Sequence, residues 1–256
     1  MISVKLPLIS STMTVMTNAA VKASRGLLRD FSELENLQVS MKSNRNFVTN
    51  ADLKSDKVLK KELLHARPSY SVLSEEAAEI VGEDPSYRWI VDPLDGTVNY
   101  MHGFPHWAIS IALEKDGEIV AAVTYDPVKN EMFQAEKGKG AFLNDRKLRV
   151  SGKRDLSGLL ITFGTLNNDI LPRVFALSPS IRKTGSMTLN MAYLAAGRTD
   201  IMYSPPNPNR WDIAAGILLI KEAGGILANR KGEQTTDLGE IFVMTNVHLL
   251  PHALNF

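Results

Sequence analysis

Apolar residues recur in the first part of this 256-residue chain at a spacing that predicts helices. Between residues 8 and 34 they lie mostly three or four positions apart, which is typical of an amphipathic helix with one buried face. A second helix is predicted over residues 49–66, with Thr49 or Asn50 as its cap. The turn formers in residues 39–47 indicate a strand or a loop between the two helices.

Short apolar runs between turn formers predict the strands of the first half. These runs span residues 70–73, 89–91, 106–113, 118–125 and 131–135. Turn signals separate the last three runs, which indicates an antiparallel meander. The run 89–91 contains no polar residue, so it is predicted to be a strand buried on both faces. Pro93 has no amide hydrogen, and we expect the strand to stop there.

The second half alternates between extended and helical patterns. Its predicted elements are a strand, a short helix, a helix that ends at a glycine, a proline-rich loop and a buried helix, over residues 159–163, 168–177, 185–197, 204–210 and 211–225. Asn209 is the expected cap of the last helix. Alternation of this kind predicts a mixed sheet layered with helices. We therefore expect an α+β fold in which residues 1–150 and 151–256 are two halves of one compact unit.

Composition and charge exclude several classes of protein. Apolar residues make up 44% of the chain and charged residues 22%, which is ordinary for a soluble globular protein. The net charge of +1 provides no global field for nucleic acid or an anionic membrane. The absence of cysteine excludes disulfides and thiol nucleophiles and fits a cytoplasmic protein. The N-terminus lacks a secretory signal, and the apolar run 213–220 is too short to span a bilayer.

The first candidate for chemistry is the string Asp-Pro-Leu-Asp-Gly-Thr that follows the buried run 89–91. Asp92 and Asp95 leave the strand three residues apart with the Leu94 carbonyl between them, and all three are the hard oxygen donors that Mg²⁺ prefers. Thr97 begins a helical turn whose amides and hydroxyl can meet a phosphate. An Asp-Gly pair alone is more often a plain surface turn, but the whole string and its buried strand favour a metal site.

Other acidic positions have ordinary explanations when each is taken alone. Asp52 and Asp212 fall in the first turns of predicted helices, where a carboxylate complements the helix dipole. Glu75 and Glu76 end a predicted strand and are followed by further acids, as in a solvated acidic loop. The glycine-rich stretch 138–142 follows a hairpin and lacks the third glycine of a dinucleotide fingerprint, so we reject it as a phosphate loop.

As a set, these acids stand in motifs that resemble the inositol monophosphatase family of Mg²⁺-dependent, lithium-sensitive sugar phosphatases. The matching motifs are Asn50-Ala51-Asp52, Ser74-Glu75-Glu76, residues 89–100 and residues 211–216. The resemblance covers roughly residues 10–246 in family order and is strongest to the bacterial SuhB-type branch. It implies the layered α-β-α-β-α sandwich of the sugar phosphatases, which fructose-1,6-bisphosphatase shares, and a homodimer.

The resemblance also implies a set of metal ligands for two or three Mg²⁺ ions. Glu75, Asp92 and the Leu94 carbonyl would hold the first ion, and Glu75 would help to place a third. The second ion would be held by Asp92, Asp95 and Asp212.

Catalytic and substrate-binding roles follow from the same resemblance. Thr97, hydrogen-bonded to Asp52, would orient the attacking water together with Glu75. The amides of Gly96 and Thr97 would hold the phosphate. The sugar or polyol would lie beside Asp95, Gly185, Ser186 and Met187.

One segment departs from the family pattern and leaves the substrate open. Inositol-hydrolysing relatives usually supply a glutamate to the ring hydroxyls from the segment before the motif that begins at Trp211. In this chain, residues 201–211 contain three prolines and no carboxylate. Met187 is also bulkier than the small residue common at its position. The alternatives are a bisphosphate nucleotidase and a regulatory or binding protein with a weakly active pocket. A nucleic-acid binder has only scattered basic residues in its favour.

Overall fold

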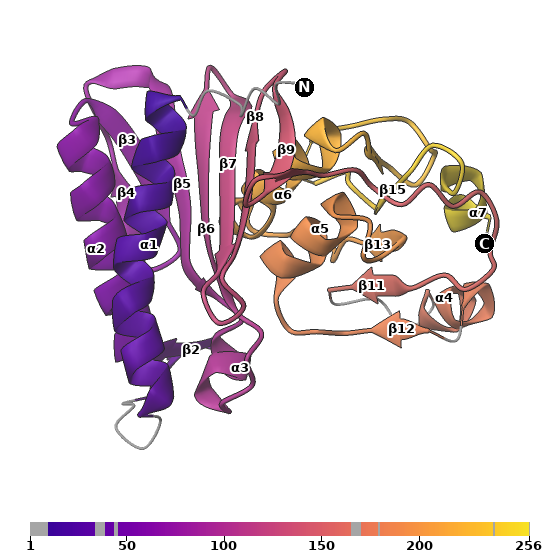
Figure 1. Ribbon diagram of the computed structural model, residues 1–256, viewed down its shortest axis with the longest axis horizontal. Helices are drawn as coiled ribbons and strands as arrows, with labels where there is room; N and C mark the ends of the chain where they lie inside the picture. The colour runs from indigo at the N-terminus through magenta and orange to yellow at the C-terminus, as the bar shows by residue number, and fades with distance from the viewer. Residues whose placement is uncertain are drawn as a thin grey trace, which may run out of the picture.

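Five layers of secondary structure follow one another along the long axis of the computed structural model, which describes residues 10–33, 39–43, 46–164, 170–178, 180–237 and 239–255 (Figure 1). Helices α1 (Ser11–Ser32) and α2 (Asn50–Ala66) form the first layer, and an eight-stranded sheet forms the second. Next come helices α5 (Met187–Ala195) and α6 (Arg210–Glu222), then a five-stranded sheet. The last layer holds the short helices α4 (Leu171–Leu177) and α7 (Leu250–Leu254).

The eight-stranded sheet has the order β10-β9-β8-β7-β6-β5-β3-β4. Its strands are β3 (Tyr70–Ser74), β4 (Ala77–Ile80), β5 (Asp84–Asp95), β6 (Ala108–Lys115), β7 (Glu118–Asp126), β8 (Glu131–Glu136), β9 (Gly140–Leu143) and β10 (Arg146–Lys147). Strands β6, β7 and β8 form the predicted antiparallel meander. Only the pair β3–β5 is parallel among these described strands, so β3 and β5 end at the same edge of the sheet.

The five-stranded sheet has the order β12-β11-β13-β15-β14 and is mixed, as the alternating pattern predicts. Its strands are β11 (Ile161–Phe163), β12 (Ile181–Arg182), β13 (Ile201–Tyr203), β14 (Ile226–Ala228) and β15 (Val243–Thr245). A separate antiparallel pair, β1 (Val39–Ser43) and β2 (Asn46–Thr49), shows that the segment before α2 is extended rather than a loop. The predicted start of α4 at residue 168 lies outside the described residues.

Strand β5 is buried on both faces, as its unbroken apolar run predicts. Trp89 and Val91 face the core under α1 and α2, whereas Ile90 faces the core shared with α5 and α6. The expectation that the strand stops at Pro93 is wrong, because pairing with β6 resumes at Asp95 after a register shift. Such a bulge tolerates a residue without an amide hydrogen and bends the strand, which re-aims the side chains that follow.

Residues 77–80 also differ from expectation, because they form the edge strand β4 rather than a loop. All four residues are exposed, and the Glu79 carboxylate pairs with Arg88 at 3.2 Å. A short, charged edge strand of this kind resists pairing with another sheet. Across the described residues, no helix combines the length and the apolar character needed to cross a membrane.

Candidate active site

Acids that are distant in sequence converge at the end of β5. Asp92 is 1% exposed, and its Oδ1 accepts a hydrogen bond from the Leu94 amide at 3.0 Å. Burial raises the pKa of Asp92 well above its usual range. Three negative charges raise that pKa further, in the order Glu75, Asp95 and Asp212. These carboxylates therefore lie close enough to Asp92 to act on its ionisation.

Glu75 reaches this place because β3 and β5 are parallel neighbours. It directly follows β3, and its amide donates to the Val91 carbonyl of β5 at 3.3 Å. Val91 precedes Asp92, so the ends of two adjacent strands deliver Glu75 and Asp92 to one edge of the sheet. Helix α2 is tied to the same edge, since the Ser55 hydroxyl donates to the Pro93 carbonyl at 2.9 Å.

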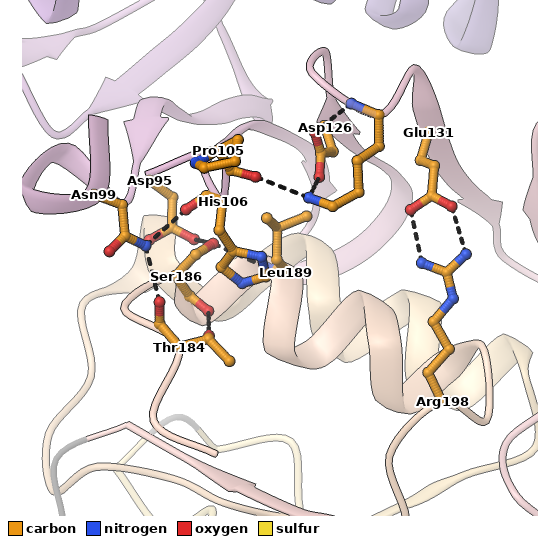
Figure 2. A network of polar contacts seen from close by, with 11 residues as sticks. Asp95, Asn99, Pro105, His106, Asp126, Glu131, Thr184, Ser186, Leu189 and Arg198 are labelled. Carbon is orange, nitrogen blue, oxygen red and sulfur yellow. Dashed lines mark hydrogen bonds and ion pairs between the residues drawn. The ribbon is translucent and has the colours of Figure 1, made fainter. Parts of the chain in front are cut away.

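The Asp95 carboxylate is held by the first turn of α5 (Figure 2). Its Oδ2 accepts from the Ser186 hydroxyl at 2.5 Å, the Thr188 hydroxyl at 2.6 Å and the Thr188 amide at 2.7 Å. Its Oδ1 accepts from the Met187 amide at 3.2 Å. Free amides and the positive end of the dipole at a helix start favour an anion. Ser186 and Met187 thus bind Asp95, and their contact with a polyol stays a prediction.

Asp212 is the third residue of α6, in a capping box with Asn209, which confirms the predicted cap. Its Oδ2 accepts from the Asn209 amide at 3.2 Å and from the Asn209 side-chain nitrogen at 3.1 Å. Burial raises the pKa of Asp212 to about 7, and the charge of Asp95 contributes. Asp212 therefore has the cap role that helix starts commonly require and also belongs to the acidic cluster.

The turn after β5 is fixed by the backbone conformation of Gly96 and by a hydrogen bond of the Thr97 side chain. Gly96 has a φ of 93°, and a Cβ there would come within 3.0 Å of the His106 carbonyl oxygen, so both conformation and space require glycine. The Thr97 hydroxyl donates to the Leu94 carbonyl at 3.0 Å. A hydroxyl carries one proton, so in this conformation Thr97 does not donate to Asp52. A Thr97–Asp52 bond stays a prediction for the loaded site.

Asp52 lies in the first turn of α2, as predicted, and is 2% exposed. Tyr100 lies in the helical turn α3 (Thr97–Met101). Burial raises the pKa of Tyr100, and the negative charges of Asp30 and then Asp52 raise it further. The Tyr100 hydroxyl itself donates to the Leu27 carbonyl at 2.7 Å. Glu75, Asp95 and Asp212 thus act on Asp92, whereas Asp52 lies on the neighbouring helix α2, which contacts the end of β5 through Ser55.

The donors of this region fit a hard divalent cation by their chemistry. Glu75, Asp92, Asp95 and Asp212 offer carboxylates, and Leu94 offers a carbonyl, so the set contains oxygen only. In the described part of the chain, no group of three or more aspartate, glutamate, histidine or cysteine side chains is arranged so that it could hold a metal ion. Asp95 and Asp212 instead direct oxygens to amides and hydroxyls, which compensate their charges.

An ion-pair network around one buried carboxylate connects the two elements that carry Asp92 and Asp212. Glu114 of β6 stands opposite Arg88 of β5 and is 4% exposed. Its Oε2 accepts from the Arg88 Nε at 2.8 Å, and its Oε1 pairs with Arg210, the first residue of α6. One carboxylate therefore fixes the start of α6 against β5. We call Arg88, Glu114 and Arg210 the Glu114 network.

Sequence reasoning missed three residues of this region. Thr188 and Glu114 act through contacts that no local pattern reveals, although hydroxyls at both Ser186 and Thr188 are a signal for an anion at the start of a helix. Asn99 stands in the family motif, but the sequence assigns it no role. In the glycine-rich stretch 138–142, the Gly138 amide donates to the Glu222 carboxylate at 2.7 Å.

The raised pKa of Asp212 predicts that the metal-free protein loses stability as the pH rises. In the unfolded chain an aspartate titrates near pH 4, whereas in the folded chain the pKa of Asp212 is about 7. The folded state thus binds this proton more tightly, so the stabilisation is complete below about pH 4 and is lost as the pH rises through 7. The difference corresponds to roughly 4 kcal/mol at most.

Urea unfolding in EDTA, from about pH 5 to about pH 8, measures this effect when wild type is compared with Asp212→Asn. The variant cannot titrate at position 212. The difference between its free energy of unfolding and that of wild type should therefore shift in favour of the variant as the pH rises. Added Mg²⁺ should restore stability to wild type at the high end of the range. Parallel pH profiles of the two proteins would contradict the assignment.

Known proteins resemble this chain over most of its length. A model of the inositol monophosphatase family matches residues 9–253. An inositol-1-monophosphatase of Rhizobium meliloti strain 1021 is 47% identical over 232 residues, which are 87% of this chain and 87% of the relative. Nus factor SuhB of Xylella fastidiosa strain Temecula1 is 40% identical over 231 residues, which are 86% of this chain and 82% of the relative.

A solved structure is similar throughout. The extragenic suppressor protein suhB from Bartonella henselae matches with a TM-score of 0.89 and 44% identity, over 96% of this chain and 99% of that chain. This likeness confirms the layered α+β fold, and the family match confirms the resemblance seen in the motifs. Inositol-1-monophosphatases are phosphoric monoester hydrolases, in agreement with the expected class of enzyme. The roles of single site residues stay predictions.

Proposed function

Because the chain belongs to the inositol monophosphatase family, we propose that it is a Mg²⁺-dependent phosphomonoesterase acting on inositol monophosphate or a related small polyol or sugar phosphate. The observation that carries this proposal is geometric: the adjacent ends of the parallel strands β3 and β5 deliver Glu75, Asp92 and Asp95 to one edge of the sheet. Such a cluster repels a phosphate monoester unless cations balance its charge. The acids and the substrate are therefore compatible only when divalent ions lie between them.

Each residue of the candidate active site has a proposed role in hydrolysis. Glu75, Asp92, the Leu94 carbonyl, Asp95 and Asp212 would hold two or three Mg²⁺ ions. Bound Mg²⁺ supplies activation of a water molecule and neutralisation of charge on the leaving oxygen. The Gly96 and Thr97 amides would hold the phosphate, because backbone donors suit the charge that spreads over its oxygens.

Thr97 is proposed to orient the attacking water with Glu75. Thr97→Ala should therefore lower kcat about 100-fold, as loss of an orienting or proton-accepting group does, while the Mg²⁺ dependence changes little. Thr97→Ser keeps the hydroxyl and is the matched control, expected to retain most activity. Phosphate release as a function of Mg²⁺ concentration measures both. Unchanged turnover in Thr97→Ala would remove this role.

The polyol side of the site favours a small or variable substrate. Inositol-hydrolysing family members usually supply a glutamate from the segment before Trp211, whereas residues 201–211 here contain three prolines and no carboxylate, and Pro205 of this segment packs against Gly164. A proline cannot hydrogen-bond a ring hydroxyl through its side chain. Recognition of the leaving group is thus proposed to depend on Asp95 and on residues 185–187.

A phosphate-release screen tests the proposal directly. The panel contains inositol 1-phosphate, sugar phosphates, a polyol phosphate and adenosine 3′,5′-bisphosphate, each with Mg²⁺ and with EDTA. We expect release only with Mg²⁺, with inositol 1-phosphate or another small polyol phosphate as the best substrate. Preference for the bisphosphate would favour the nucleotidase alternative. Release in EDTA, or none from any compound, would overturn the proposal.

A regulatory or binding role is the second candidate, and the name Nus factor of the Xylella fastidiosa relative is what favours it. This candidate predicts weak turnover over the whole panel, although Mg²⁺ still binds. We also infer a cytoplasmic homodimer from the family resemblance, with no nucleic acid needed for assembly. Light scattering should then give about twice the chain mass of 28.2 kDa.

A further inference from the structure

One side-chain amide links the two halves of the molecule beside the candidate site (Figure 2). The Asn99 Nδ2 donates to the His106 carbonyl at 2.7 Å and to the Thr184 carbonyl at 2.8 Å. An asparagine amide carries two hydrogens, and both are used here. Thr184 is 85 residues away in sequence, so Asn99 holds two segments that no secondary structure joins.

The segment on the far side packs directly on this amide. Gly185 has a φ of 87°, and a Cβ there would come within 2.9 Å of the Asn99 side chain. Both its conformation and the close approach require glycine. Any side chain at position 185 would push the loop away from Asn99.

The loop is then fixed a second time by Asp95. Ser186 caps α5 and donates its hydroxyl to Asp95 at 2.5 Å, so the chain returns to the end of β5 only two residues after Thr184. Asp95 and Asn99 stand on either side of Gly96 and Thr97 in sequence. The two contacts therefore hold residues 184–186 against the same turn that is proposed to bind the phosphate.

We propose that Asn99 is a positioning residue that fixes residues 185–187 relative to Gly96 and Thr97, so that the bound polyol is aligned with its own phosphate. This inference rests on the proposed function. Asn99 acts through the loop and touches no substrate. Misplacing the polyol by about 1 Å is enough to cost about 100-fold in rate, so loss of the clamp should fall on substrates with hydroxyls to align.

Asn99→Asp is the sharpest variant, because the carboxylate has the same shape but cannot donate to two carbonyl oxygens. Two substrates are compared in the full protein with Mg²⁺: the polyol phosphate that wild type hydrolyses fastest, and p-nitrophenyl phosphate, whose leaving group has no hydroxyls. We expect kcat/KM to fall about 100-fold for the first and less than about 5-fold for the second. Asn18→Asp, the same change on the exposed face of α1, should alter neither.

Equal losses of kcat/KM on the two substrates would show that Asn99 is merely structural. Unchanged kcat/KM on both substrates would show that the clamp does nothing. Either result overturns the proposal. Asn99→Ser keeps one donor and should fall between wild type and Asn99→Asp. Gly185→Ala should reproduce the selective loss. The double variant with Asn99→Asp should lose little more, since both changes break the same contact between Asn99 and the loop. Fully additive losses would count against a shared clamp.

Amide hydrogen exchange separates this inference from the proposed function, because it needs no turnover. In the full-length protein with Mg²⁺ and without substrate, exchange at residues 186–189 should be at least about 10-fold faster in Asn99→Asp than in wild type or Asn18→Asp. Unchanged exchange overturns the clamp even if phosphatase activity is confirmed. Faster exchange in a protein that releases no phosphate supports the clamp and overturns its kinetic role together with the proposed function.

Discussion

Asp92→Asn should abolish Mg²⁺-dependent phosphate release, with a loss of about 1,000-fold or more, and should stabilise the metal-free protein. Asp92 is the acid that the family resemblance assigns to both of the first two ions, and an amide of the same shape cannot bridge two cations. The same side chain is buried among Glu75, Asp95 and Asp212, whose charges raise its pKa. Removing its charge relieves that repulsion.

Phosphate release and urea unfolding in EDTA at neutral pH measure the two effects. The gain in the free energy of unfolding should be about 1–2 kcal/mol, as is common when a crowded functional site is relaxed. Asp116→Asn is the matched control: Asp116 is an exposed turn residue with a φ of 50°, which asparagine tolerates. Retained turnover, or lower stability without metal, would count against Asp92 as the shared ligand.

Glu114→Gln should lower the free energy of unfolding by about 3 kcal/mol and raise the Mg²⁺ concentration needed for half-maximal activity. The change leaves Arg88 and Arg210 without the carboxylate that they share. Burial and the charge of Arg88 already lower the pKa of Arg210, so the two guanidinium groups repel one another. Without Glu114, the start of α6 that carries Asp212 is no longer fixed against β5.

Glu118→Gln provides the comparison, because Glu118 also pairs with a basic residue but is half-exposed on the surface. Its loss should change stability by less than about 1 kcal/mol and leave the Mg²⁺ dependence unaltered. Urea unfolding and a Mg²⁺ titration of activity are measured on all three proteins. If Glu114→Gln is as stable as Glu118→Gln, the Glu114 network does not position α6.

Local patterns in the sequence predict the parts of the fold whose causes are local. The burial of β5 on both faces and the cap at Asn209 follow from residues within a few positions of one another. The path of β5 past Pro93 does not, because it depends on where β6 resumes pairing. The edge strand β4 was missed for the same reason: its four exposed residues carry no apolar alternation, and only its pairing with β3 makes it a strand.

The candidate site divides in the same way. Each acid could be placed at the end of a strand or the start of a helix, but their convergence required the family resemblance, since no spacing encodes it. Three sets of contacts join segments that meet only after folding: the hydrogen bonds from Thr188 to Asp95, those of the Asn99 side chain, and the Glu114 network. Hydroxyls and amides at such places look like ordinary polar residues until a buried carbonyl or carboxylate is seen beside them.

The central claim is that Glu75, Asp92, the Leu94 carbonyl, Asp95 and Asp212 bind divalent cations at the end of β5. Anomalous diffraction from crystals soaked in Mn²⁺, a hard cation that takes similar ligands, tests it most directly. We predict at least two anomalous peaks at this edge of the sheet, each about 2.0–2.3 Å from oxygens of these residues and with Asp92 shared between them. Crystals of active protein that show no peak there, or peaks only elsewhere, would contradict the claim.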